Sequence, residues 1–324
     1  MGRSVNIPGQ KSVNITGIQL HFSVVVFLIA LVLLPSCKKP EEKKAAVDFS
    51  DRIQIPQDNQ LKNSQPIRIA IAAMISPKET AQYYEQMMKY VSRKLERPVN
   101  ITQKKTYDEV NDMLERKELD IAFVCSGPYV IGKKKFSMEL LVAPMLYGKP
   151  FYQAYFIVHK DSPVNDIKEL KGKRFAFTDP ASNTGKLVPT YILSKMGTDP
   201  EHYFKEIIFT YGHDNSIKAV SKGLVDGASV DGLIWDYYQD KNPDFISNTK
   251  IIFKSPLYGI PPVVVHPQLP EAEKKEIKKI FLTLHEDPEG KKILSELLIE
   301  KFIVPDDASY NSIREMQSWI DRQN

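Results

Sequence analysis

The sequence predicts an α/β protein with two lobes, each formed by a mixed, mainly parallel sheet with helices on its faces. Short apolar segments typical of strands alternate with segments whose apolar residues recur every three to four positions, as in helices. Such alternation favours parallel sheets. The pattern restarts after Pro144, and the C-terminal part leads back toward the first half. This order indicates that the second lobe is inserted into the first.

The first half contains three predicted strands, at residues 66–72, 99–102 and 119–124, and helices at residues 79–95 and around Val110. Ligands of parallel α/β sheets bind at the carboxyl ends of the strands. Tyr107 and Ser126 follow the second and third strands, so they stand where a binding site is expected.

The second half continues the alternation. We expect strands at residues 155–158, 173–177, 207–210 and 228–231, a short helix at 166–170 and a helix that carries Ile217, Val220 and Leu224. Residues 251–253 and 262–265 lead the chain back, and residues 271–285 and 291–301 are predicted amphipathic helices. The sequence shows no internal repeat.

The N-terminus is predicted to be a lipoprotein signal peptide, residues 1–37. An apolar run from His21 to Leu34 follows Arg3 and Lys11, and it is short for a membrane-spanning helix. Leu34-Pro35-Ser36-Cys37 resembles the bacterial lipobox, in which the cysteine, here Cys37, is lipidated. The alternative is an uncleaved anchor with a chance cysteine. Residues 38–65 are polar and charged, which predicts a flexible tether.

Charge and cysteine content exclude several functions. The net charge is +4, and residues 1–37 hold two basic and no acidic residues, so the mature chain carries +2. That excess indicates neither nucleic acid nor an anionic membrane as partner. After Cys37 only Cys125 remains, so no internal disulfide forms and no zinc spacing exists. We expect Cys125 to be a buried thiol; the alternative is a reactive nucleophile.

The segment from Thr178 to Pro189 predicts an anion site. It follows a strand and precedes a helix, where backbone N–H groups are unpaired and the helix dipole is positive. Ser182, Asn183 and Thr184 add neutral donors, and Gly185 allows close backbone approach. Pro189 argues against a regular helix from Asn183. The alternative is an ordinary helix cap.

Five motifs occur in this order: Asp161-Ser162-Pro163, Leu170-Lys171-Gly172-Lys173, Asp179-Pro180-Ala181-Ser182-Asn183-Thr184-Gly185, Gly212-His213-Asp214 and Lys254-Ser255-Pro256-Leu257. Together they resemble one family, the phosphate/phosphite/phosphonate-binding lipoproteins of ABC importers. The resemblance implies a type II periplasmic-binding fold that closes over an oxyanion. Lobe 1 would comprise residues 66–150 and 255–324, and lobe 2 residues 151–254, with hinges near residues 148–152 and 253–259.

The resemblance also implies the site residues. Ser182, Asn183, Thr184 and His213 would hold the oxyanion from lobe 2. Tyr107 and Ser126 would contact it from lobe 1, and Tyr152 from the hinge. Asn183 departs from the commoner Ser-Thr-Ser pattern. The alternatives are packing for the two tyrosines and a helix cap or a surface position for His213.

Asp231 favours phosphorus over sulfur oxyanions. A carboxylate repels a bound anion unless the anion has a proton to donate, and phosphate, phosphite and phosphonate are partly protonated near neutral pH. The alternative is a structural Asp at a strand end. Relatives that bind aminoalkylphosphonates resemble one another in extra carboxylates where this chain has Leu233 and Pro261. Phosphate, phosphite or a small alkylphosphonate is therefore expected, with Met74, Tyr84 and Tyr258 as candidates to line an organic tail.

The expected function is a non-catalytic receptor, monomeric and exported, that delivers its ligand to a membrane permease. A sensory binding protein that signals to a histidine kinase or chemoreceptor is the alternative. The chain lacks the nucleophile elbow, metalloprotease helix and P-loop motifs. We therefore expect no catalytic residues, cofactor or metal.

Overall fold

The computed structural model describes residues 53–54, 65–72 and 77–323. The predicted signal peptide with Cys37, most of the predicted tether, and Met74 lie outside these residues. Ile53–Gln54, within the predicted tether, form β1, which pairs with the edge strand β3 (Val99–Lys104). This piece of the tether is therefore part of a sheet edge and is not free. No helix of the described residues combines the length and hydropathy needed to span a membrane.

The α/β class is confirmed, and the same βαβαβ unit occurs twice. The first unit comprises β2, α2, β3, α3 and β4 (Ile67–Ala72, Pro77–Lys94, Val99–Lys104, Tyr107–Glu115 and Ile121–Phe123). The second comprises β8, the turn η2 with helix α5, β9, α7 and β10 (Arg174–Phe177, Asn183–Leu187, Val188–Lys195, Glu206–Phe209, His213–Ser221 and Gly227–Asp231). Their strand orders correspond, β3-β2-β4 and β9-β8-β10, and all four pairings are parallel. The structure thus contains a repeat that the sequence does not show.

Each unit is extended by antiparallel strands. The first sheet has seven strands in the order β1-β3-β2-β4-β13-β5-β14, and the second has five in the order β11-β7-β10-β8-β9. The added strands are β5, β7, β11, β13 and β14 (Glu139–Met145, Ala154–His159, Thr249–Lys254, Val263–Val265 and Lys301–Ile303). The sheets are mixed, as predicted, but parallel pairing does not dominate either of them. The reason is the insertion: β5 leaves the first lobe beside the returning β13, and β7 enters the second beside the departing β11.

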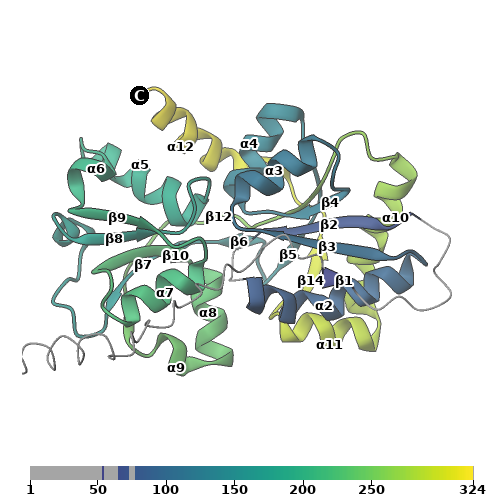
Figure 1. Cartoon of the computed structure of the whole chain (residues 1–324), viewed down its shortest axis with the longest axis horizontal. Helices are drawn as coiled ribbons and strands as arrows, with labels where there is room; N and C mark the ends of the chain where they lie inside the picture. The colour runs from purple at the N-terminus through teal and green to yellow at the C-terminus, as the bar shows by residue number, and fades with distance from the viewer. Residues whose placement is uncertain (1–52, 55–64, 73–76, 324) are drawn as a thin grey trace, which may run out of the picture. The chain divides into compact units, whose positions relative to one another are not determined.

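Two short strands join the lobes. β6 (Phe151–Tyr152) and β12 (Tyr258–Gly259) form a two-stranded antiparallel sheet of their own. Figure 1 shows both labels between the two larger sheets. Tyr152 is therefore placed on a strand that connects the lobes.

Helices cover both faces of each sheet (Figure 1). In the first lobe, α3 and α4 (Ser126–Phe136) lie on one face of the sheet and α2 lies on the other. In the second lobe, α5 and α6 (Pro200–Tyr203) lie on one face, and the opposite face is covered by α7, α8 (Gly232–Lys241) and α9 (Pro243–Ile246). The central strands β2, β4, β7 and β13 consist almost wholly of buried apolar residues, because a sheet covered on both faces has no solvent side. The predicted helix at 166–170 is a 3₁₀ turn, η1 (Ile167–Leu170).

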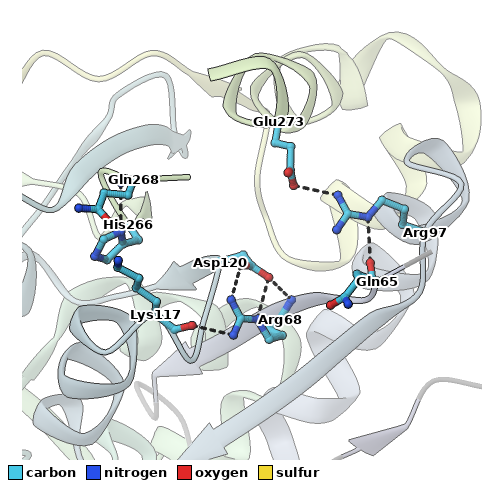
Figure 2. A network of polar contacts seen from close by, with 8 residues as sticks. All are labelled: Gln65, Arg68, Arg97, Lys117, Asp120, His266, Gln268 and Glu273. Carbon is cyan, nitrogen blue, oxygen red and sulfur yellow. Dashed lines mark hydrogen bonds and ion pairs between the residues drawn. The ribbon is translucent and has the colours of Figure 1, made fainter. Parts of the chain in front are cut away.

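The same arginine–aspartate pair stands at the amino-terminal edge of each βαβαβ unit. Arg68 Nη2 and Asp120 Oδ1 are 2.6 Å apart, and the backbone N–H of Arg68 donates to Asp120 Oδ2 at 2.8 Å. Figure 2 shows this pair beside Lys117 and the Arg97–Glu273 ion pair. Arg174 and Asp226 repeat every one of these contacts in the second unit, with N–H to Oδ2 at 2.8 Å and Nη2 to Oδ1 at 2.8 Å. Both pairs join the first strand of a unit to the residue just before its third strand.

The C-terminal segment differs from the prediction in two ways. It contains α10, η3, α11, β14, η4 and α12 (Glu271–Thr283, Leu284–Glu286, Pro288–Glu296, Lys301–Ile303, Asp307–Tyr310 and Asn311–Asp321). The predicted helix 291–301 ends early because Leu298 takes a positive φ of 57°, and the chain turns into β14. Helix α12 is not among the predicted helices, and its Trp319 Nε1 donates to Ser194 Oγ on α5 at 3.0 Å.

Candidate oxyanion site

The predicted site residues lie at the starts of helices. Tyr107, Ser126, Asn183 and His213 are the first residues of α3, α4, η2 and α7. Asp231 is the N-cap of α8, and its Oδ1 accepts the N–H of Leu233 at 2.8 Å. Each helix start carries a partial positive charge and unpaired N–H donors. The carboxyl ends of both βαβαβ units therefore present an electropositive surface made of dipoles.

All eight predicted side chains are buried. Tyr107, Ser126, Tyr152, Ser182, Asn183, Thr184, His213 and Asp231 are each no more than 2% exposed. Among them, Tyr107 OH, Asn183 Oδ1, Thr184 Oγ1 and His213 Nε2 have no hydrogen-bond partner. A buried polar atom without a partner costs about 1–3 kcal/mol, so its occurrence in four of the eight predicted side chains favours a polar ligand at these residues.

The loop after β8 forms a turn of π-helix. Ser182 Oγ accepts the N–H of Gly185 at 3.0 Å, and the N–H of Leu187 reaches back to Ser182 O at 2.9 Å. A Cβ on Gly185 would lie 2.6 Å from the Thr178 side chain, so only glycine allows this turn. The Ser182 hydroxyl keeps its own proton to donate.

Pro189 explains why the turn is held so tightly. It has no N–H, so Gly185 O lacks the donor that it would have in a regular helix. The N–H of Val188 donates to Asn183 O, so Thr184 O also lacks its regular helical donor. Ser229 Oγ donates to Thr184 O at 2.6 Å, and the N–H of Thr178 donates to Gly185 O at 3.2 Å. The neighbouring strands thus fix the turn and with it the Thr184 hydroxyl.

His213 is a neutral donor. Its Nδ1 accepts the backbone N–H of Asp231 at 3.0 Å, so Nδ1 carries no proton and Nε2 does. Burial lowers the pKa of His213 to about 3. The unpartnered Nε2–H is therefore available to an acceptor throughout the physiological pH range.

Tyr152 contacts Asn183 from the connecting strand. Asn183 Nδ2 and Tyr152 OH are 3.0 Å apart, and Asn183 Oδ1 has no partner. Turning the amide by 180° lets the Tyr152 hydroxyl donate to Oδ1 and leaves Nδ2 as the group without a partner. In that orientation the asparagine supplies a donor to an anion, and Tyr152 holds it in place.

Ser126 can donate to a ligand through its backbone but not through its hydroxyl group. Its Oγ donates to Gly259 O on β12 at 2.6 Å, so the hydroxyl proton is already used. Its available donor is the backbone N–H in the first turn of α4. The preceding Cys125 is fully buried, which raises the pKa of its thiol; a buried thiol was expected, and the nucleophile alternative has no support.

Asp231 is a carboxylate with weakened acidity. Burial is the main reason that its pKa is raised to about 7, and Asp236 adds to the effect. Near neutral pH, Asp231 and a bound oxyanion can therefore share one proton. An oxyanion that carries no proton near neutral pH can share one only when Asp231 itself is protonated.

Asp179 is a residue whose role sequence reasoning missed. Its Oδ2 accepts the N–H of Tyr107 at 3.1 Å, and its Oδ1 accepts the N–H of Ala181 at 2.8 Å. Burial raises its pKa to about 6. The carboxylate of one lobe thus caps helix α3 of the other. The sequence shows Asp179 followed by Pro180, but it does not reveal that Asp179 accepts the N–H of Tyr107, 72 residues away.

Comparisons with known proteins agree with this geometry. Residues 69–310 match the family described as the periplasmic substrate-binding protein of phosphonate ABC transporters. The phosphonates-binding periplasmic protein of Escherichia coli is 31% identical over 54% of this chain, and the match spans 53%, about half, of that protein. A probable phosphite-binding protein of an ABC transporter from Prochlorococcus marinus is 27% identical over 62% of this chain and 71% of its own length.

Two solved structures show the same fold. A binding-protein component of a phosphonate ABC transporter from Pseudomonas aeruginosa superposes with a TM-score of 0.74 at 25% identity, covering 80% of this chain and 88% of the other. A Prochlorococcus marinus protein in complex with methylphosphonate gives a TM-score of 0.72 at 22% identity, covering 79% and 98%.

Proposed function

Since this chain belongs to the family of periplasmic substrate-binding proteins of phosphonate ABC transporters, we propose that it captures a phosphonate between its two lobes for import. The observation that carries the proposal is the set of buried donors without a partner at the helix starts. They are Tyr107 OH, Thr184 Oγ1, His213 Nε2 and, with its amide turned, Asn183 Nδ2. The family is a transporter component and not an enzyme.

The anion is held by neutral donors and helix dipoles. His213 donates through Nε2–H, Thr184 and Tyr107 through their hydroxyls, and Ser126 through its backbone N–H. Lys186, the lysine of the loop, has its ammonium 4.3 Å from the centre of the Phe177 ring, so its charge is used elsewhere. Fixed dipoles in a buried site stabilise an oxyanion without rearranging when it binds.

Asp231 supports the choice of phosphorus over sulfur. A phosphorus oxyanion can share a proton with the raised-pKa carboxylate, whereas sulfate and sulfonates bring no proton and are repelled. The site accordingly discriminates between oxyanions by their protonation state. Phosphite and phosphate share this chemistry and remain alternatives within the proposal.

Lobe closure is the proposed mechanism. Residues 66–150 and 255–324 form one lobe and 151–254 the other, with β6 and β12 as the hinge, while α12 reaches across to α5. The ligand stabilises the closed arrangement because it is contacted from both lobes.

We further propose that the protein is an exported, monomeric lipoprotein. Residues 1–37 would be its signal peptide, Cys37 its lipidated residue, and residues 38–65 the tether, apart from β1. The lipid would hold the protein at a bacterial membrane next to the permease that receives the ligand.

Calorimetric titration tests the proposal. The purified protein should bind methylphosphonate, with sulfate giving no heat of binding. Thr184→Val and His213→Ala should each weaken binding by about 1–3 kcal/mol, because each removes a buried donor. Matched controls are Thr190→Val, on α5, whose hydroxyl donates to Lys186 O in η2, and the exposed His202→Ala. Equal affinity in all four variants, or tight sulfate binding, would refute the proposed site.

A further inference from the structure

A cavity of about 90 Å³ adjoins the oxyanion site at Asp231. Among the described residues that line it, Asp231 is the one charged side chain, and apolar residues dominate the rest, with Tyr84 and Tyr237 as the other polar ones. The cavity is therefore polar on the side of the anion site and apolar elsewhere.

Both lobes contribute to its walls, next to the helix starts. Phe123 and Val124 line it directly before Cys125 and Ser126, where α4 begins. Leu233 and Ile234 line it from the first turn of α8, directly after Asp231. A ligand whose oxyanion is held at these helix starts would point its remaining substituent into the cavity.

The lining is suited to hydrocarbon. A water molecule needs two to four polar partners to reside in a cavity, and Leu146, Ile260, Pro261 and Leu298 offer no side-chain hydrogen bonds here. Burial raises the pKa of the Tyr84 phenol to about 12, with Asp231 adding to the effect, so this side chain brings no charge. For scale, an apolar cavity of about 150 Å³ accepts a benzene ring. The present one holds roughly three or four carbon atoms on that scale.

We propose that the substrate is an organophosphonate with a short hydrocarbon substituent of this size. This proposal rests on the proposed function and names the class of ligand. An inorganic oxyanion would leave the cavity unused. An aminoalkyl group would bury an ammonium with Asp231 as its one described counter-charge, and that carboxylate already caps α8 and shares a proton with the oxyanion.

The first test compares methylphosphonate, propylphosphonate and 3-aminopropylphosphonate by calorimetry. Each buried methylene is expected to tighten binding about fourfold, so propylphosphonate, with two more methylenes, should bind about fifteenfold tighter than methylphosphonate. The amine should bind more weakly than the propyl compound. Failure of all three to bind would overturn the proposed function. Binding of methylphosphonate as tightly as propylphosphonate, or tighter binding of the amine, would overturn only the hydrocarbon proposal.

Substitutions in the cavity wall provide the second test. Leu146→Trp should fill the cavity and weaken propylphosphonate about tenfold, while methylphosphonate changes less than twofold. Leu224→Trp, on an exposed leucine outside the cavity, is the matched control. Leu233→Glu should reverse the preference between the propyl and aminopropyl compounds, because it places a carboxylate where the tail lies. Thermal unfolding verifies that each variant is folded. Equal effects on methyl- and propylphosphonate from both cavity variants would contradict the proposal.

Discussion

His213 and Asp231 act as a pair, although neither titrates in the way its residue type suggests. The Asp231 N–H fixes the tautomer of His213, and burial moves the two pKa values in opposite directions, His213 to about 3 and Asp231 to about 7. At neutral pH the histidine is therefore a neutral donor, and the carboxyl group is the member that gains or loses a proton.

The pH dependence of binding should follow Asp231. Its pKa in the folded protein is raised, so the protonated form that suits an anion is present below about pH 7 and is lost as the pH rises through that value. Affinity for methylphosphonate should fall up to tenfold per pH unit above about pH 8, with proton uptake on binding. Calorimetry in buffers of different ionisation enthalpy measures that uptake.

Asp231→Asn should remove this pH dependence. The amide donates a hydrogen bond without titrating, so the slope should flatten, and sulfate should gain affinity. His202→Ala, on an exposed residue, is the control that leaves the slope intact. A variant that keeps the slope and still rejects sulfate would place the coupled proton on another group.

At the scale of elements, two helix starts approach each other across the lobes. Gly127, in the first turn of α4, lies so close to the η2 loop that an added Cβ would be 2.5 Å from Ala181 O and 3.1 Å from Asn183 N. Both neighbours are backbone atoms, held by the Ser182 cap and by the Asp179 contacts. The closed arrangement therefore requires a glycine at this position.

Gly127→Ala should weaken ligand binding without unfolding the protein. The methyl group would clash with Ala181 O only when the lobes are closed, so the substitution should lower affinity at least tenfold while the melting temperature of the ligand-free protein changes little. Titration together with small-angle X-ray scattering measures both the affinity and the closure on adding ligand. The control is Ala181→Gly, which removes a methyl group next to the same contact. Gly197→Ala would not serve, because Gly197 has a positive φ that alanine rarely adopts. Wild-type affinity in Gly127→Ala would mean that the lobes bind ligand in a more open arrangement.

For the whole molecule, helix α12 links the lobes in addition to the two strands. Near its start, Tyr310 OH donates to Ile260 O at 2.9 Å in the first lobe. Near the end of α12, Trp319 donates a hydrogen bond to Ser194, and Lys195 Nζ lies 3.2 Å from the centre of the Trp319 ring. Ser194 and Lys195 both belong to α5. The closed state thus gains contacts far from the ligand.

Trp319→Ala should weaken all ligands alike. Losing a hydrogen bond and a cation–π contact should cost roughly 1–2 kcal/mol of closure, with the ratio of propyl- to methylphosphonate affinity unchanged. Titration of both ligands measures this. Trp235→Ala is the control, since Trp235 bonds Thr249 within the second lobe. A changed ratio would show instead that α12 alters the site itself.

Local sequence patterns were sufficient to predict the α/β class and the residues at strand ends. Strand and helix periodicity depend on neighbours a few positions away, and polar residues before helices follow from unpaired N–H groups. Tyr107, Ser126, Ser182, Asn183 and Thr184 are predicted as site residues for this reason, whereas the prediction for His213 rests on the family resemblance. The strand directions and the end of α11 are not predictable in this way, because they depend on pairing with strands far away in the sequence, such as β14 with β5.

Tertiary structure alone decided the chemical state of the site. The tautomer of His213 depends on a backbone group 18 residues away, and the raised pKa values of Asp179 and Asp231 depend on burial by both lobes. The apolar cavity is assembled from segments between Tyr84 and Phe302. The two βαβαβ units correspond in strand order and in their Arg–Asp pairs without visible repetition in the sequence. Hydrogen bonding and desolvation act between residues that are close in space, whatever their separation along the chain.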